Sequence, residues 1–375
     1  MAKVRGVAVW ESRLLGILAA ALAVFGVAAV YGASSIWAVE RGDPSYQYAL
    51  NQLGGVLAGV LVLLVASRLD YHYWRRFAWP LLIATALVLL VLILPFTHAI
   101  APVRNGARRW LQVGFRIQPS ELAKFVIVAW TAMLAARKGE QIREFKKGLL
   151  PFLVVLVPLV GMVVLEPDLS TGVTLLAIAG TIMFVAGAKI GHFLLLGLVA
   201  LPVLWQQIVS VQYRVARLAG FLGPGGDLEQ ASWQIRQSMI GIGAGRLFGV
   251  GFGEGMQKLG YLPYAYSDFI FSTIGEEWGF VGVTLLLLLF AVFLVLGFRI
   301  ARQAPDSFGM YIATGLTVML GLAVVLHVGV NMHLVPATGI SLPFISFGRS
   351  GLLVAFLATG VLLNIARQGR EGSLR

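Results

Sequence analysis

Residues 280–297 read FVGVTLLLLLFAVFLVLG and contain no charged side chain. An α-helix needs about 20 predominantly apolar residues to cross a hydrocarbon core of ~30 Å, so this stretch predicts a transmembrane helix. The whole chain has the same character: 58% of its 375 residues are hydrophobic, 12% are charged, and the mean hydropathy is +0.85. An ordinary soluble domain is about half apolar and about a quarter charged, which excludes a water-soluble fold.

Similar apolar blocks recur along the chain, near residues 14–36, 47–67, 77–97, 122–136, 149–165, 170–188, 192–209, 269–298, 308–332 and 351–366. They predict an all-α polytopic membrane protein with about ten transmembrane helices. None of the blocks has the alternating ~10-residue pattern of a membrane β-barrel. We expect a single membrane domain over residues 1–375, with a long loop at about 210–268 between spans seven and eight.

The net charge of +12 has a topological explanation. With an even number of spans both termini share one side, and placing that side in the cytoplasm puts Arg75, Arg76, Arg143 and Lys147 in inner loops. This bias follows the positive-inside rule. We therefore expect cytoplasmic termini, an extracytoplasmic loop at 210–268, and no nucleic-acid partner.

Residues 118–124 place charges where an outer connection enters a span. Pro119 suits the first turn of a helix, and Glu121 then lies near the positive N-terminal end. Glu121 and Lys124 are three residues apart and share a helix face. They predict either a structural ion pair that closes the top of the bundle or a pair that orients a substrate.

Three guanidinium groups, those of Arg104, Arg108 and Arg109, stand beside Trp110 on the outer side and so break the positive-inside trend. Guanidinium groups bind phosphates through bidentate hydrogen bonds. We expect these arginines to bind a phosphate-bearing substrate; anchoring to lipid headgroups is the alternative.

Asp268 stands at the start of a long apolar span, and Glu276 and Glu277 follow about two turns further into it. A carboxylate in such a place has a raised pKa, which suits a general base near neutral pH; a partner for the helix dipole is the alternative. The glycine-rich run at 241–253 has neither the preceding strand nor the Gly-Lys-Ser/Thr of a nucleotide loop. Five histidines without ligand spacing and the absence of cysteine exclude zinc, disulfide and thiol chemistry.

Several motifs taken together resemble the SEDS family (shape, elongation, division and sporulation). They run in order over nearly the whole chain: residues 105–110 (NGARRW), 118–121 (QPSE) with Lys124, 166–171 (EPDLST), Gln237 and Ser238, 267–271 (SDFIF), 275–277 (GEE) and 336–346 (PATGISLPFIS). Residues 185–189, 257–263 and 362–367 are more similar to the division branch, FtsW, than to the elongation branch, RodA.

The resemblance implies a ten-helix glycosyltransferase of the bacterial inner (cytoplasmic) membrane that polymerises lipid II into peptidoglycan on the extracytoplasmic side. It implies a class B penicillin-binding protein as transpeptidase partner, together with other division or elongation membrane proteins. It also assigns the catalytic aspartate to Asp268. An α-linked donor giving a β-1,4 product requires inversion, so one base suffices.

A departing lipid diphosphate needs positive charge. The candidate substrate-binding residues are Arg108, Arg109, Glu121, Lys124, Asp168, Arg214, Arg236, Ser238, Lys258 and Ser346. A divalent cation, Mg²⁺ or Mn²⁺, held by Asp168 and Asp268 is expected as well, and no organic cofactor. A lipid II flippase, or an elongation-type polymerase, is the alternative. The chain departs from the family at Arg349 and Arg246, where glycine is usual.

Overall fold

The computed structural model describes residues 9–94, 96–97, 100–102, 108–113, 115–222 and 229–373. In the described part, nine helices are long and apolar enough to cross a membrane, and a shorter apolar helix, Leu169–Val185, adds a tenth hydrophobic segment. This confirms the predicted all-α polytopic fold. The elements are α1 (Val9–Glu40), α2 (Gln47–Arg68), α3 (His72–Ile93), β1 (Leu111–Val113), β2 (Phe115–Ile117), α4 (Pro119–Lys138), α5 (Leu150–Leu165), α6 (Leu169–Val185), α7 (Ile190–Val209), α8 (Gln212–Leu222), α9 (Glu229–Ala244), α10 (Ile270–Arg302), α11 (Ser307–Asn331) and α12 (Arg349–Ser373).

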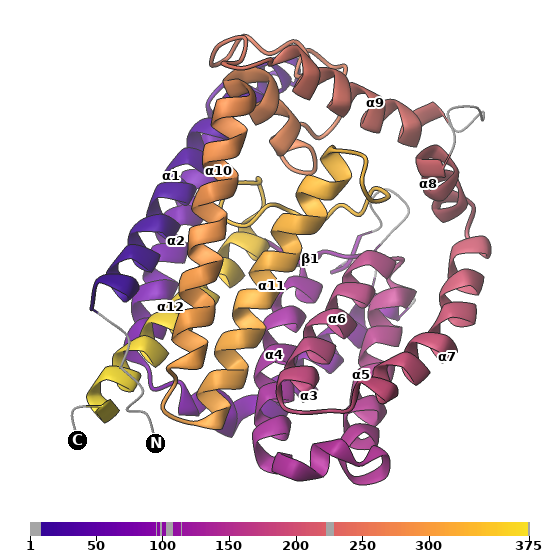
Figure 1. Ribbon diagram of the computed structural model, residues 1–375. Coiled ribbons are helices and arrows are strands. Elements are labelled where there is room, and N and C mark those ends of the chain that lie inside the picture. Colours follow the sequence, from indigo (N-terminus) through magenta and orange to yellow (C-terminus); the bar gives the residue numbers. More distant parts are fainter. Residues whose placement is uncertain are drawn as a thin grey trace.

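The helices form one bundle in which α1 begins and α12 ends at the same end (Figure 1). We call this the inner end, and the opposite end, where α8, α9 and the start of α10 lie, the outer end. Helices α4, α11 and α12 are the most enclosed, with 78%, 67% and 67% of their most apolar stretches buried. Small residues let neighbouring helices approach closely, as where Gly315 of α11 faces Ile182 and Val128.

Helix α7 differs from the other spans because none of its residues is buried. It stands at the flank of the bundle, and α8 and α9 lead from it over the outer end (Figure 1). Leu194, Leu198 and Val199 are each more than 60% exposed. An apolar helix with this exposure is suited to lipid and not to water.

The long outer loop contains helices α8 and α9. Two outer features were not predicted. One is the short antiparallel hairpin of β1 and β2, in which Leu111 pairs with Ile117. The other is a break in α10 at Gly279, which has φ 66° and ψ −167°.

The break corrects the expectation that Glu276 and Glu277 lie two turns inside a continuous span. The N–H groups of Phe280 and Val281 donate instead to the loop carbonyls of Arg246 (2.8 Å) and Leu247 (3.0 Å). The first segment of α10 therefore belongs to the outer loop structure, and the apolar span begins after Gly279. The backbone groups released by the break are satisfied by the loop, as a buried backbone requires.

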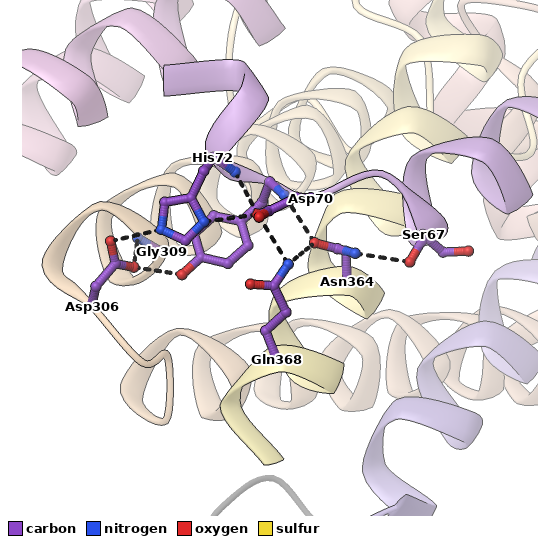
Figure 2. A network of polar contacts seen from close by, with 8 residues as sticks. Ser67, Asp70, His72, Asp306, Gly309, Asn364 and Gln368 are labelled. Carbon is purple, nitrogen blue, oxygen red and sulfur yellow. Dashed lines mark hydrogen bonds and ion pairs between the residues drawn. The ribbon is translucent and has the colours of Figure 1, made fainter. Parts of the chain in front are cut away.

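At the inner end a network of polar contacts joins the α2–α3 connection to α11 and α12 (Figure 2). We call it the inner clasp; it consists of Ser67, Asp70, Tyr71, His72, Asp306, Gly309, Asn364 and Gln368. Asp306 caps α11 by accepting from the N–H of Gly309 (2.9 Å), and it also accepts from the Tyr71 hydroxyl (2.7 Å). The His72 ring lies between Asp70 and Asp306, at 2.7 and 3.4 Å.

Candidate active site

Asp268 is fixed at the outer end between the long loop and α10. Its N–H donates to the carbonyl of Tyr264 (3.1 Å), and its own carbonyl accepts from Nδ2 of Asn331 (3.2 Å). Its carboxylate faces Gly339, where φ is 72° and a Cβ atom would lie 3.9 Å from Oδ2. The start of α10 and the segment after α11 thus meet at this carboxylate.

A cavity of about 30 Å³ adjoins Asp268; it is lined by Arg217, Gln234, Asp268, Phe269, His327, Val330, Ala337, Thr338, Gly339 and Ile340. Burial raises the pKa of Asp268, while a hydrogen bond from Ser267 and the positive charges of Arg217 and Arg109 act in the opposite direction. A carboxyl group whose pKa is moved toward neutrality suits proton abstraction better than an ordinary surface aspartate.

The segment 336–346 connects Asp268 to the start of α4. Ser346 donates to the carbonyl of Ser267 (2.7 Å) and accepts from the N–H of Leu342 (2.8 Å). Nearer α4, a Cβ atom on Gly351 would lie 3.1 Å from Ser341 Oγ and 3.3 Å from Glu121 Oε2. Ser346 therefore holds the segment in place.

Glu121 and Lys124 form an ion pair of 2.6 Å in the first turns of α4. Their side chains are only 13% and 7% exposed. The helix begins where its sequence predicts, with Pro119 in the first turn and Gln118 donating its N–H to Ser350 Oγ (3.0 Å). The pair is thus a desolvated charge pair at the mouth of the bundle.

The connection between α5 and α6 contributes a second acidic position. Asp168 caps α6 by accepting from Thr171, through N–H (3.2 Å) and Oγ1 (2.9 Å). Burial and the neighbouring charge of Asp168 raise the pKa of Glu166 to about 9, with Arg109 opposing. Arg109 donates to the carbonyls of Glu166 and Pro167, and its charge acts on both Glu166 and Asp268. It links the two acidic positions electrostatically.

Within the described ranges, no group of three or more His, Asp or Glu side chains could hold a metal ion. Both oxygens of Asp168 already accept hydrogen bonds, although each retains a lone pair. Mg²⁺ is often bound by one or two carboxylates together with substrate phosphates. A divalent cation at Asp168 or Asp268, as the sequence leads us to expect, would need further ligands such as substrate phosphates.

Several predicted site residues make structural contacts. Lys258 pairs with Glu277 (3.0 Å), each side chain being 2% exposed, and Ser238 bonds to Ser272 and to the carbonyl of Asn331. Arg214 donates to the carbonyl of Gln207 (2.7 Å) and Arg108 to that of Leu94 (2.9 Å), whereas Arg236 is exposed on α9. Arg104 and the rest of residues 103–107 lie outside the described residues.

Sequence reasoning missed Arg217, His327 and Thr338, which line the cavity beside Asp268. Arg217 comes from α8, His327 from the last turns of α11, and Thr338 from the segment after it. A lone histidine close to the end of an apolar span and shortly before a polar motif was the available signal, since intramembrane ionisable residues are functional candidates by default.

Residues 12–371 match the family model for the cell cycle proteins FtsW, RodA and SpoVE. The chain is 39% identical to the stage V sporulation protein E of Bacillus subtilis, over 95% of this chain and 97% of that protein. It is 37% identical to an FtsW of a Geobacter species named as a probable peptidoglycan glycosyltransferase, over 94% of this chain and 96% of that protein.

Solved structures agree with these relatives. A chain in a peptidoglycan synthase complex, described as coordinating polymerization and crosslinking, superposes with a TM-score of 0.77 at 28% identity, over 95% of this chain and 97% of that one. The rod shape determining protein RodA of Thermus thermophilus gives a TM-score of 0.69 at 26% identity, over 94% of this chain and 96% of that one. The family model takes its name from FtsW, RodA and SpoVE. The chain therefore belongs to the SEDS family of multi-pass membrane proteins.

Proposed function

We propose that this chain is a peptidoglycan glycosyltransferase, a single membrane domain that polymerises lipid II into glycan strands with inversion. The observation that carries the proposal is Asp268, a carboxylate with a raised pKa at the wall of a cavity that is also lined by Arg217. The relatives named as probable peptidoglycan glycosyltransferases FtsW support it.

In this mechanism Asp268 accepts the proton of the acceptor hydroxyl as that oxygen attacks the anomeric carbon of the donor sugar. The bond to the lipid diphosphate breaks on the opposite face, so no covalent enzyme intermediate is required. General-base assistance of this kind is worth about 10²–10⁴-fold.

The departing diphosphate needs a positive environment. Arg109 and Arg217 are the cations whose charge reaches Asp268, and we propose that they stabilise the leaving group. Lys124 is a weaker candidate because its amine is already paired with Glu121. Asp168 and Asp268 are the residues that would hold a divalent cation, which would supply positive charge to stabilise the departing diphosphate.

We place the site on the extracytoplasmic face of the bacterial inner membrane. The basic residues at the inner end, among them Arg75 and Arg76 in the first turns of α3 and Lys147 before α5, support this orientation. The chain has no cysteine, so the variants Glu140→Cys and Tyr261→Cys each carry a single thiol. A membrane-impermeant thiol reagent added outside should label only the variant Tyr261→Cys. Labelling of Glu140 from outside would reverse the orientation.

A class B penicillin-binding protein is the proposed partner. The related chain within a peptidoglycan synthase complex supports it, because crosslinking in that complex accompanies polymerization. The division role is proposed from the FtsW relatives, and an elongation role is the alternative. A lipid II flippase would be expected to have charged sites near the bilayer midplane, whereas the acids and bases of the candidate active site lie at the outer end.

The test is polymerisation of purified lipid II in detergent by the purified chain with its transpeptidase partner. A detergent micelle has no two leaflets between which a lipid could be moved. Formation of glycan polymer in detergent would therefore exclude flipping as the only activity of the chain. Asp268→Asn keeps the size of the side chain and cannot accept the proton. Its rate should fall by about 10²-fold or more while thermal stability and partner binding are retained.

The same assay has a pH signature. A base must be ionised to act, and the pKa of Asp268 is raised. Polymerisation should therefore fall as the pH falls through that raised pKa, at a higher pH than an ordinary aspartate of pKa about 3.9 would give. A variant Asp268→Asn that polymerises within a few-fold of wild type would show that the aspartate is structural. A wild-type chain that makes no polymer would contradict the function itself.

A further inference from the structure

His327 is a buried residue of α11 with one ring nitrogen fixed by the backbone. Its Nδ1 lies 2.8 Å from the carbonyl oxygen of Ile340. A carbonyl can only accept, so Nδ1 carries the proton. No carboxylate in the described residues hydrogen bonds to this ring, and a charged imidazolium would be stranded at a site with 1% exposure. The ring is therefore neutral, and Nε2 is a lone-pair acceptor.

That acceptor has no hydrogen-bond partner among the described residues, and the same holds for the buried Oγ1 of Thr338. Both residues line the cavity beside Asp268. Buried polar atoms without partners are uncommon in folded proteins and call for a ligand or an ordered water. Two such atoms on one small cavity, next to the proposed base, point to the same bound group.

The size of the cavity limits what that group can be. A water molecule requires about 10–15 Å³ on this measure, so about 30 Å³ accommodates about two or three water-sized groups. A sugar ring is too large, whereas one hydroxyl group projecting from a sugar fits. The ligand must offer an O–H donor to Nε2 and an oxygen that accepts from Thr338.

We propose that His327 and Thr338 form a hydroxyl-binding site that positions the reacting group against Asp268. The oxygen donates to Nε2 and accepts from Thr338 Oγ1. Two sources have this chemistry: a resident water that donates its second proton to Asp268, and a hydroxyl of the acceptor saccharide next to the one that reacts. His327 is a positioning residue in either case. The inference rests on the proposed glycosyltransferase function.

The test compares two deletions with a conservative variant in the detergent polymerisation assay. His327→Leu removes both ring nitrogens, and Thr338→Val removes only the hydroxyl. Each should lower kcat/KM by about tenfold, which corresponds to one hydrogen bond of ordinary strength. His327→Asn offers an N–H to Ile340 and an oxygen to the ligand, so it should recover most of the activity lost in His327→Leu.

Thr314→Val is the matched control, because this hydroxyl lies on the same helix and is satisfied by its own backbone, through Met310 (2.8 Å). It should remain within about twofold of wild type. The kinetic split identifies the source of the hydroxyl. A rise in the KM for lipid II assigns it to the saccharide, and a fall in kcat at constant KM assigns it to a water.

Two results would overturn the proposal. One is His327→Leu and Thr338→Val both within about twofold of wild type, with wild type polymerising normally. The other is His327→Leu and His327→Asn equally impaired, with lowered thermal stability and with Thr338→Val fully active, since that pattern describes a packing role. A wild-type chain that fails to polymerise would instead contradict the proposed function, so the two failures are distinguishable.

Discussion

The outer and inner ends of the bundle each contain a glutamate followed three residues later by a lysine, and the two pairs are in different environments. Glu121 and Lys124 at the outer end are 2.6 Å apart and 13% and 7% exposed. Glu144 and Lys147 at the inner end are 3.5 Å apart and 56% and 68% exposed. The same local pattern is desolvated in one place and solvated in the other. The i, i+3 spacing therefore predicts that the two side chains can form an ion pair, whereas burial determines how much that pair contributes to stability.

Backbone conformation shows the same contrast. Arg246, Tyr264, His333 and Phe344 have positive φ between 47° and 66°, and all four lie in outer connections. Non-glycine residues in this region cost free energy and gather at functional sites. The inner clasp, by comparison, satisfies its groups with ordinary geometry: hydrogen bonds from His72 and Gln368 overcome the effect of burial and lower the pKa of Asp70. These four strained residues lie at the same end of the bundle as the candidate active site.

The largest effect that tests this comparison comes from the two glutamate–lysine pairs. Glu121→Ala or Lys124→Ala leaves a buried charge without its partner, which costs about 3–5 kcal/mol for a well-buried pair. We expect a large loss of thermal stability and of polymerisation from either change. The double variant should lose less than the sum, because it leaves no stranded charge.

Glu144→Ala and Lys147→Ala are the matched controls, with the same spacing at the inner end. Exposed pairs contribute little, so both should melt and polymerise as wild type does. Thermal melts in detergent and polymerisation rates measured side by side on the five variants check this. Strict additivity at the outer pair, or an equal loss at the inner pair, would show that the two environments do not differ as described.

A smaller effect is expected at the inner clasp. Asp306→Ala removes the cap of α11 and the acceptor of the buried Tyr71 hydroxyl. Losing a cap costs about 1 kcal/mol. The melting temperature should fall by a few degrees, and the polymerisation rate per folded molecule should be unchanged. Asp306→Asn, which retains an acceptor, should recover part of the stability. A loss of rate beyond the loss of folded protein would mean that the inner end couples to the site.

The positions of the membrane-spanning helices were predictable from the sequence because residues inside the hydrocarbon core must be predominantly apolar. The charged pair of α4 was also visible, since i, i+3 neighbours meet whatever the rest of the fold does. Expectation failed where distant segments determine the outcome. The break at Gly279 depends on the loop carbonyls of Arg246 and Leu247, which accept the released N–H groups. No local propensity contains that information.

Contacts between distant segments also explain why some residues of the candidate active site were predicted wrongly or missed. Lys258 was a candidate for binding diphosphate, yet its amine is used by Glu277, nineteen residues further along. His327 was passed over, although Ile340 fixes its tautomer and the fold brings it to the cavity of Asp268. The sequence identifies which residues have reactive or charged side chains. Tertiary packing determines which of those side chains are paired with another residue and which remain available to a ligand.

The smallest effect is expected at Arg349, the outer residue at which the chain departs from the glycine usual in the family. Arg349 is exposed at the start of α12 and donates to Asn51 Oδ1 (2.7 Å). An exposed hydrogen bond is worth little, and a cation at a helix N-terminus opposes the helix dipole. Arg349→Gly should therefore change stability by no more than about 0.5 kcal/mol and leave polymerisation of lipid II within about twofold. Asn51→Ala, which removes the other partner, is the control. A strong loss of activity in Arg349→Gly with a normal melt would show that this chain has recruited the arginine into its site, and the outer end would then extend to the surface of α2.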